Sequence, residues 1–105
     1  MQLKLVLLVL ASLITSCVNL SQQGANVLLV ETKELLPAEC HFIRYVEAYG
    51  PQDELASAFA AAKINLRNRA GKYQANYVVI TKKMEVFLPG GAIVGGNAYE
   101  CAEAI

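Results

Sequence analysis

An uncharged apolar run from Leu5 to Ile14 is the first clear pattern in the chain, and Lys4 supplies a positive charge before it. Its ten residues suffice for the hydrophobic region of an export signal but fall well below the roughly 20 that a transmembrane helix needs. Polar residues follow soon after, beginning at Thr15 and Ser16. The pattern therefore predicts a targeting segment and not a membrane span.

The residues that close this segment, Ile14-Thr15-Ser16-Cys17, resemble the lipobox that lipoprotein signal peptidase recognises. Small side chains let the backbone enter the peptidase, and the thiol is the nucleophile that takes a diacylglycerol as a thioether. We therefore predict a cleaved signal peptide at residues 1–16, a lipidated Cys17 with a short tether at 17–24, and a single domain at 25–105. The alternatives are an ordinary Cys17 after a conventional cleavage site, although no A-x-A-like site stands nearby, and an uncleaved anchor.

Acyl chains on Cys17 are expected to hold the protein at a membrane, because stable anchoring takes at least two chains. In enteric bacteria an Asp after the lipidated cysteine retains a lipoprotein in the inner membrane. Val18 in that position favours the outer membrane, with the domain in the periplasm. The seven residues from Val18 to Gly24 reach about 25 Å at most, so the domain is expected to stay near its membrane.

Two strands are predicted in the first half of the mature chain. The apolar run from Ala25 to Glu31 fits a strand, and the polar, proline-containing segment from Thr32 to Glu39 fits a connection. Side chains alternate from Cys40 to Glu47 as in a second strand, with both faces partly apolar. The alternation assigns Cys40, Phe42, Arg44 and Val46 to one face and His41, Ile43 and Tyr45 to the other.

A helix is predicted after Gly50-Pro51, because proline suits the first helical position and the acidic residues that follow favour the positive end of the helix dipole. Apolar residues then recur at spacings of three and four, and basic residues gather toward the carboxyl end. The apolar stripe comprises Leu55, Phe59, Ala62, Leu66, Ala70 and Tyr73. This pattern predicts a helix with one face on a sheet.

The last third of the chain has the highest β-propensity. The segment from Ala75 to Lys82 predicts a strand that is covered on both faces and central in the sheet. Met84 to Leu88 fits a further edge strand, the glycine-rich segment from Pro89 to Gly96 fits a loop, and Asn97 to Ala102 fits the last strand. The predicted fold class is α+β, with one helix packed on a small, largely antiparallel four-stranded sheet (β-β-α-β-β).

Composition and charge narrow the classes of function. The 105 residues include nine basic and nine acidic side chains, and the basic ones are scattered along the sequence, which predicts neither nucleic-acid binding nor recognition of acidic lipid. One histidine, no tryptophan and no run of acidic residues give no catalytic constellation, metal cage or cofactor motif. We therefore expect no enzyme, no cofactor and no metal.

The cysteines predict one disulfide bond. If Cys17 becomes a thioether, Cys40 and Cys101 remain as an even number in an oxidising compartment, where disulfides form and persist. Their bond would close a loop of about 60 residues and stabilise the fold by roughly 4 kcal/mol in the chain-entropy treatment. Redox chemistry is the alternative, but neither cysteine lies in a C-x-x-C motif.

Other side chains have both a structural and a functional interpretation. His41 suits a general base or a metal ligand but has no second histidine, so a strand-surface position is favoured. Lys63 and Arg67, four residues apart on the helix, form a candidate interaction surface for phosphate or carboxylate groups. The five tyrosines suit a recognition surface, although packing over a small core is the favoured interpretation.

Three segments resemble a known family: Leu66-Arg67-Asn68-Arg69-Ala70, Ala75-Asn76-Tyr77-Val78-Val79-Ile80 and Ala98-Tyr99-Glu100-Cys101. The pattern is similar to that of small bacterial envelope lipoproteins grouped as a domain of unknown function. Those proteins are similar in fold to the outer-membrane stress-sensor lipoprotein of the Rcs phosphorelay. The resemblance covers about Cys40 to Ala102 and implies one helix on a four-stranded sheet, a disulfide to the last strand, an envelope location and no enzymatic activity.

The chain departs from this pattern in its cysteines, its tether and its helix end. The stress sensor has four cysteines in its domain and a long proline-rich tether, whereas this chain has two and a short tether. Family members often have glycine before the A-N pair, where a helix ends in the left-handed conformation. Gln74 stands there in this chain, at a steric cost, and a cap shifted to Gly71 is the alternative.

These features together predict an outer-membrane-anchored lipoprotein with a non-enzymatic interaction or sensor-like domain, which presents a sheet face or edge to an envelope protein partner. The alternative is a small ligand-binding or hydrolytic lipoprotein that acts on cell-wall or lipid material through His41 and a carboxylate such as Glu39 or Glu47. Location in the envelope is the feature that favours this alternative.

Overall fold

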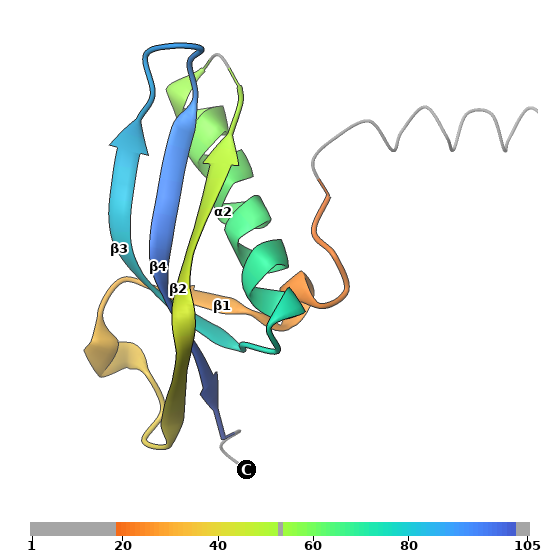
Figure 1. The fold of residues 1–105 in the computed structure, drawn as a ribbon, viewed down its shortest axis with the longest axis vertical. Helices are drawn as coiled ribbons and strands as arrows, with labels where there is room; N and C mark the ends of the chain where they lie inside the picture. Colours follow the sequence, from red (N-terminus) through yellow and green to blue (C-terminus); the bar gives the residue numbers. More distant parts are fainter. Residues whose placement is uncertain (1–18, 53, 103–105) are drawn as a thin grey trace, which may run out of the picture.

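A computed structural model describes residues 19–52 and 54–102, so the predicted signal segment and Cys17 lie outside the described residues. The elements are Gly24–Asn26 (η2), Leu28–Val30 (β1), Lys33–Leu35 (η3), Cys40–Gly50 (β2), Leu55–Lys72 (α2), Tyr77–Glu85 (β3) and Ala92–Cys101 (β4), where η denotes a 3-10 helix. The strands form one sheet in the order β1-β3-β4-β2, and α2 covers one face (Figure 1). Only β1 and β3 pair in parallel, so the predicted α+β class is confirmed.

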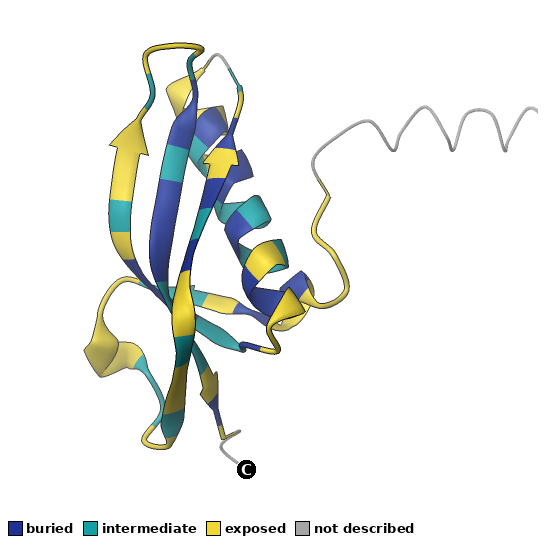
Figure 2. Ribbon diagram, viewed as in Figure 1, coloured by how far each residue is buried: buried dark blue, intermediate teal, exposed yellow. Residues whose placement is uncertain are grey.

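The buried core lies between α2 and the sheet face that it covers (Figure 2). Most of its side chains are small, which lets the helix lie close to the strands. Leu66 is fully buried at the centre of the predicted stripe, while Leu55 and Tyr73 at the two ends of that stripe are exposed. The core cluster comprises Val27, Val46, Ala48, Ala62, Leu66, Ala70, Ala75, Val78, Ile80, Val94 and Ala98.

The segment expected to form a glycine-rich loop is largely a strand. Residues 92–96 belong to β4, which lies between β3 and β2 and is mostly buried (Figure 2). The loop prediction for Pro89 to Gly96 is therefore wrong beyond residue 91. The separate edge strand expected at Met84 to Leu88 is also wrong, because Met84 and Glu85 continue β3. The predicted interior position of the strand at Val78 to Ile80 is confirmed.

Close packing explains the glycines inside β4. A Cβ atom on Gly95 would meet the hydroxyl of Tyr45 and lie 2.8 Å from Cγ of Glu47. One on Gly96 would meet the carbonyl oxygen of Val79 and lie 2.9 Å from Cγ1 of Val78. Among the glycines, positive φ occurs only at Gly90 and Gly91, where the chain turns between β3 and β4. The glycines of β4 thus leave space for neighbouring groups and do not make the strand flexible.

A β-bulge in β2 changes which side chains share a face. Phe42 pairs with Tyr99 of β4, but Arg44 pairs with the adjacent Ala98, so Ile43 is the extra residue. Neighbouring residues of β4 point to opposite faces of the sheet. Phe42 and Arg44 therefore lie on opposite faces, and the predicted simple alternation along this strand is wrong.

The sequence predicts the end of α2 better than its start. The helix begins at Leu55 and not at Pro51, because Gly50 still pairs with β4. At the other end Gln74 has a φ of 65°, and its N–H donates to the carbonyl of Gly71 at 3.0 Å. The N–H of the next residue, Ala75, donates to the carbonyl five positions earlier, which completes a Schellman motif. The left-handed position of Gln74 is confirmed, and the alternative cap at Gly71 is wrong.

We expect Gln74→Gly to raise the free energy of unfolding by about 1 kcal/mol, because glycine adopts positive φ without the steric cost of a Cβ atom. Urea unfolding followed by circular dichroism measures the change. Gln74→Ala is the matched control and should give no such gain, since alanine keeps the Cβ atom. Equal stability of the two variants would contradict this account of the helix end.

Candidate functional site

Within the described residues, α2 covers one face of the sheet and no other α-helix covers the opposite face (Figure 1). The strand registers place the side chains of this opposite face in rows across the strands. In the first row Leu28, Tyr77, Tyr99 and Phe42 are successive partners from β1 to β2. We call this surface the open face. It comprises Leu28, Val30, Phe42, Tyr45, Glu47, Tyr49, Tyr77, Val79, Lys82, Met84, Ile93, Gly95, Asn97 and Tyr99, as the strand registers place them.

Aromatic and aliphatic side chains dominate the open face. Phe42 is 59% exposed and Leu28 is 57% exposed, and the rings of Phe42 and Tyr99 meet edge to face with centroids 5.7 Å apart. Tyr45, Tyr49, Tyr77 and Tyr99 lie on the open face, Tyr73 lies at the helix end, and no tyrosine belongs to the buried core. The favoured interpretation of the tyrosines as core residues is wrong, because the narrow space between α2 and the sheet holds small side chains instead.

One ion pair interrupts this apolar surface. A second bulge, at Thr81, places Lys82 opposite Gly95, on whose other side Glu47 lies in β2. Because Gly95 has no side chain, Nζ of Lys82 reaches across β4 to Oε1 of Glu47 at 2.8 Å. This hydrogen bond and the charge of Glu47 raise the pKa of Lys82 above its ordinary value. The ion pair between Lys82 and Glu47 therefore forms a polar site on the open face, with apolar side chains on either side of it.

A hollow of about 390 Å³ marks the end of the open face near the disulfide bond. The connection between β1 and β2 forms one wall, and the rings of Phe42 and Tyr99 belong to the other. Its lining residues are Lys33, Leu36, Pro37, Ala38, Cys40, Phe42 and Tyr99. A concave site of this kind, with the rings of Phe42 and Tyr99 in one wall, suits an apolar side chain of a partner.

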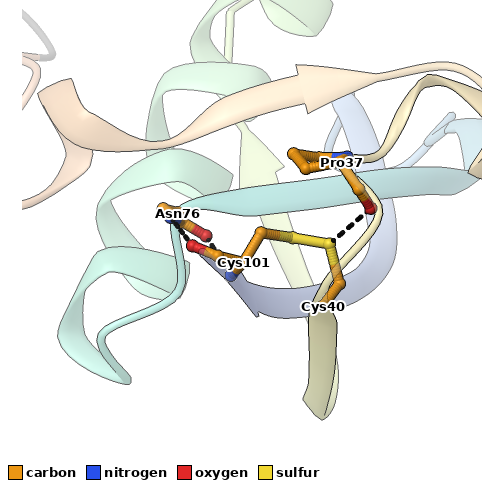
Figure 3. The surroundings of a disulfide bond; sticks show 4 residues. All are labelled: Pro37, Cys40, Asn76 and Cys101. Atoms are coloured by element: carbon orange, nitrogen blue, oxygen red, sulfur yellow. Dashed lines mark hydrogen bonds between the residues drawn. A yellow bond between two sulfur atoms is a disulfide. The ribbon is translucent and has the colours of Figure 1, made fainter. Parts of the chain in front are cut away.

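The disulfide bond between Cys40 and Cys101 joins the start of β2 to the end of β4 (Figure 3). Asn76 holds the Cys101 backbone from the side: its Nδ2 donates to the carbonyl and its Oδ1 accepts from the N–H, both at 2.7 Å. Pro37 lies on the other side, with its carbonyl oxygen 3.2 Å from Sγ of Cys40. The disulfide prediction is confirmed. The role of Asn76 was not predicted, because nothing in the sequence beyond its place in the A-N pair indicates a contact with Cys101.

The residues proposed for hydrolytic chemistry are not brought together. His41 is exposed on β2, opposite Glu100 of β4. Glu47 lies six residues further along the same strand, about 20 Å away, and pairs with Lys82. Glu39 precedes β2, and its backbone carbonyl accepts a hydrogen bond from Ala102. In residues 19–52 and 54–102, no group of three or more His, Cys, Asp or Glu side chains is arranged to hold a metal ion.

The two basic residues proposed as an interaction surface differ in their surroundings. Nε of Arg67 donates to the carbonyl of Val27 at 2.8 Å, and its Nη2 donates to the carbonyl of Ala25 at 3.3 Å. The guanidinium thus holds the segment before β1 against α2. Lys63 is half-buried one turn earlier on the helix.

No known protein family, curated protein or solved structure matches the chain. Among the helices of the described residues, none combines the length and the apolar character needed to cross a membrane.

Proposed function

We propose that the chain is an outer-membrane-anchored lipoprotein whose periplasmic domain is a non-enzymatic interaction or sensor-like module that binds an envelope protein through the open face. The lipobox ending at Cys17 supports the anchor and the location. The observation that carries the binding role is the exposed aromatic and aliphatic surface opposite α2. Contiguous exposed apolar surface of this kind is typical of protein interaction sites.

The shape and chemistry of the open face favour a protein partner. Tyrosine and phenylalanine provide large contact areas at little entropic cost, and they are enriched in protein interfaces. The hollow beside Phe42 and Tyr99 offers a place for an anchoring side chain. The Lys82 and Glu47 pair offers charged hydrogen-bonding groups that fix the orientation of a partner.

A photo-crosslinking amino acid at Tyr45 tests this proposal in cells, and the same probe at Leu55 is the control. The two side chains are equally exposed, at 40% and 41%, but Leu55 lies at the start of α2 and not on the open face. We expect a discrete adduct with an envelope protein from Tyr45 only. With that partner purified, Tyr45→Ser should weaken the Kd about tenfold, and Leu55→Ser should leave it nearly unchanged.

The same adducts from Tyr45 and Leu55 would show that the envelope protein lies near the whole domain and does not bind the open face specifically. An unchanged Kd for Tyr45→Ser, with folding confirmed by circular dichroism, would remove the open face from the interaction.

A further inference from the structure

The segment that follows the predicted lipidation site is fixed to α2. The Asn68 side chain holds it at two points: Oδ1 accepts from the N–H of Ser21 at 2.7 Å, and Nδ2 donates to the carbonyl of Asn19 at 2.8 Å. Further along the segment, a Cβ atom on Gly71 would lie 2.7 Å from the carbonyl carbon of Gln23, so the backbones are in close contact. Residues assigned to a tether by sequence are therefore part of the packed structure.

This contact shortens the distance between the anchor and the domain. Asn19 follows Cys17 by two residues, which span about 7 Å at most when fully extended. Acyl chains on Cys17 would therefore hold the surface around Asn68 close to the lipid headgroups. Free rotation on a long tether is not available to a domain attached in this way.

The surface around Asn68 is positively charged. Asn65, Asn68, Arg69 and Lys72 follow the spacing of one helix face, and together with Ala48 and Tyr49 they line a hollow of about 360 Å³. We call this group of four residues the helix C-terminal patch. Arg69 and Lys72 are exposed in the last turn, and α2 contains four basic residues and no acidic residue.

A third cation lies at the same end of the helix, and three of the acidic side chains lie in another part of the fold. The guanidinium of Arg44 stacks over the ring of Tyr73, which directly follows Lys72, with its carbon 4.4 Å from the ring centroid. Glu31, Glu34 and Glu39 lie in and beside the connection between β1 and β2. Basic residues that are scattered in the sequence are thus gathered by the fold at the carboxyl end of α2.

We propose that the helix C-terminal patch binds anionic headgroups of the phospholipid bilayer to which Cys17 anchors the chain, and that this contact keeps the open face out of the lipid. The inference rests on the proposed function, because it requires acyl chains on Cys17. The acyl chains alone would attach the domain to the membrane, and the contact of the patch would also fix the orientation of the domain. Lysine and arginine side chains held near a membrane surface are attracted to anionic headgroups.

Lysine footprinting of the full lipidated protein in vesicles tests the orientation. The protein is reconstituted into phosphatidylcholine with phosphatidylglycerol, and separately into phosphatidylcholine alone. Amines are acetylated with N-hydroxysuccinimide acetate and followed by peptide mass spectrometry. We expect acetylation of Lys72 to be about fivefold slower in the anionic vesicles. Lys33 and Lys83, which lie on other elements, should react equally in both and serve as internal controls.

A matched pair of variants separates binding from simple crowding at the surface. Arg69→Gln should reduce the protection of Lys72, whereas Lys33→Gln removes the same charge elsewhere and should leave it unchanged. High salt should also reduce the protection, because it screens exposed charges. Equal acetylation of Lys72 in both vesicles, or protection of Lys33 and Lys83 instead, would overturn the proposed orientation. An intact mass without acyl chains would overturn the lipoprotein assignment itself, and the orientation with it.

Discussion

Replacing both cysteines of the disulfide with alanine is expected to lower the free energy of unfolding by about 4 kcal/mol. Cys40 and Cys101 are 61 positions apart, so their bond removes much of the freedom of the unfolded chain. In the folded state the bond joins residues that are already direct partners in neighbouring strands. The free energy of unfolding of a domain of this size is small, so the loss amounts to a large part of it.

Urea unfolding of the oxidised protein, the reduced protein and the Cys40→Ala/Cys101→Ala variant measures this effect. Cys101 is buried, so its replacement also removes packing. The reduced protein keeps both side chains and isolates the contribution of the covalent bond. We expect the reduced protein and the variant to agree within about 1 kcal/mol. Identical urea midpoints for the oxidised and reduced protein would show that the bond adds nothing to stability.

Gly50→Ala is expected to lower the free energy of unfolding by about 3 kcal/mol. Gly50 ends β2 where α2 crosses it, and a Cβ atom there would meet the carbonyl oxygen of Ala58 and lie 2.7 Å from the nitrogen of Ala62. Both contacts are with helix backbone, which cannot move aside as a side chain can. The helix would have to shift away from the sheet and lose packing along its buried face.

Two further variants distinguish this steric explanation from others. Gly90→Ala should cost only about 1 kcal/mol, because that position has positive φ but no atom within 4 Å of the added carbon. Ala58→Gly should fail to rescue Gly50→Ala, since the obstructing atoms belong to the backbone. Thermal unfolding of the single and double variants gives the comparison. Recovery in the double variant would mean that side-chain crowding is the cause.

Much of the fold could be predicted from local patterns. The spacing of apolar residues from Leu55 to Tyr73 predicts the helix because one face must enter the core, and the run at Val78 to Ile80 predicts an interior strand because both of its faces are apolar. The order of the elements follows from the same local patterns, and the disulfide bond follows from the even number of cysteines that remain once Cys17 is lipidated. Such features depend only on neighbours in the sequence or on cysteine number.

The rest depended on contacts between distant residues. Gly95 and Gly96 suggested a loop, yet they belong to a central strand, where glycine is required because the Tyr45 hydroxyl and the Val79 carbonyl occupy the space that side chains would need. The bulge at Ile43 shifts the alternation by one residue, and no period in the sequence indicates it.

The candidate site was harder to predict for the same reason. Tyrosines look alike in sequence whether they fill a core or cover a surface, and only the strand register places four of them on the face opposite α2. The role of Arg67 likewise depends on carbonyl groups 40 and 42 positions earlier in the chain.

The position of β4 also sets the order in which the chain can acquire its structure as it emerges into the compartment where it folds. This strand is the last one described along the chain, yet it lies in the interior of the sheet and pairs with both β2 and β3. Before it emerges, β2 has no partner strand, and β3 pairs only with the three residues of β1. The emerging chain therefore cannot build its sheet strand by strand, and the sheet forms only when β4 is available to pair with both neighbours.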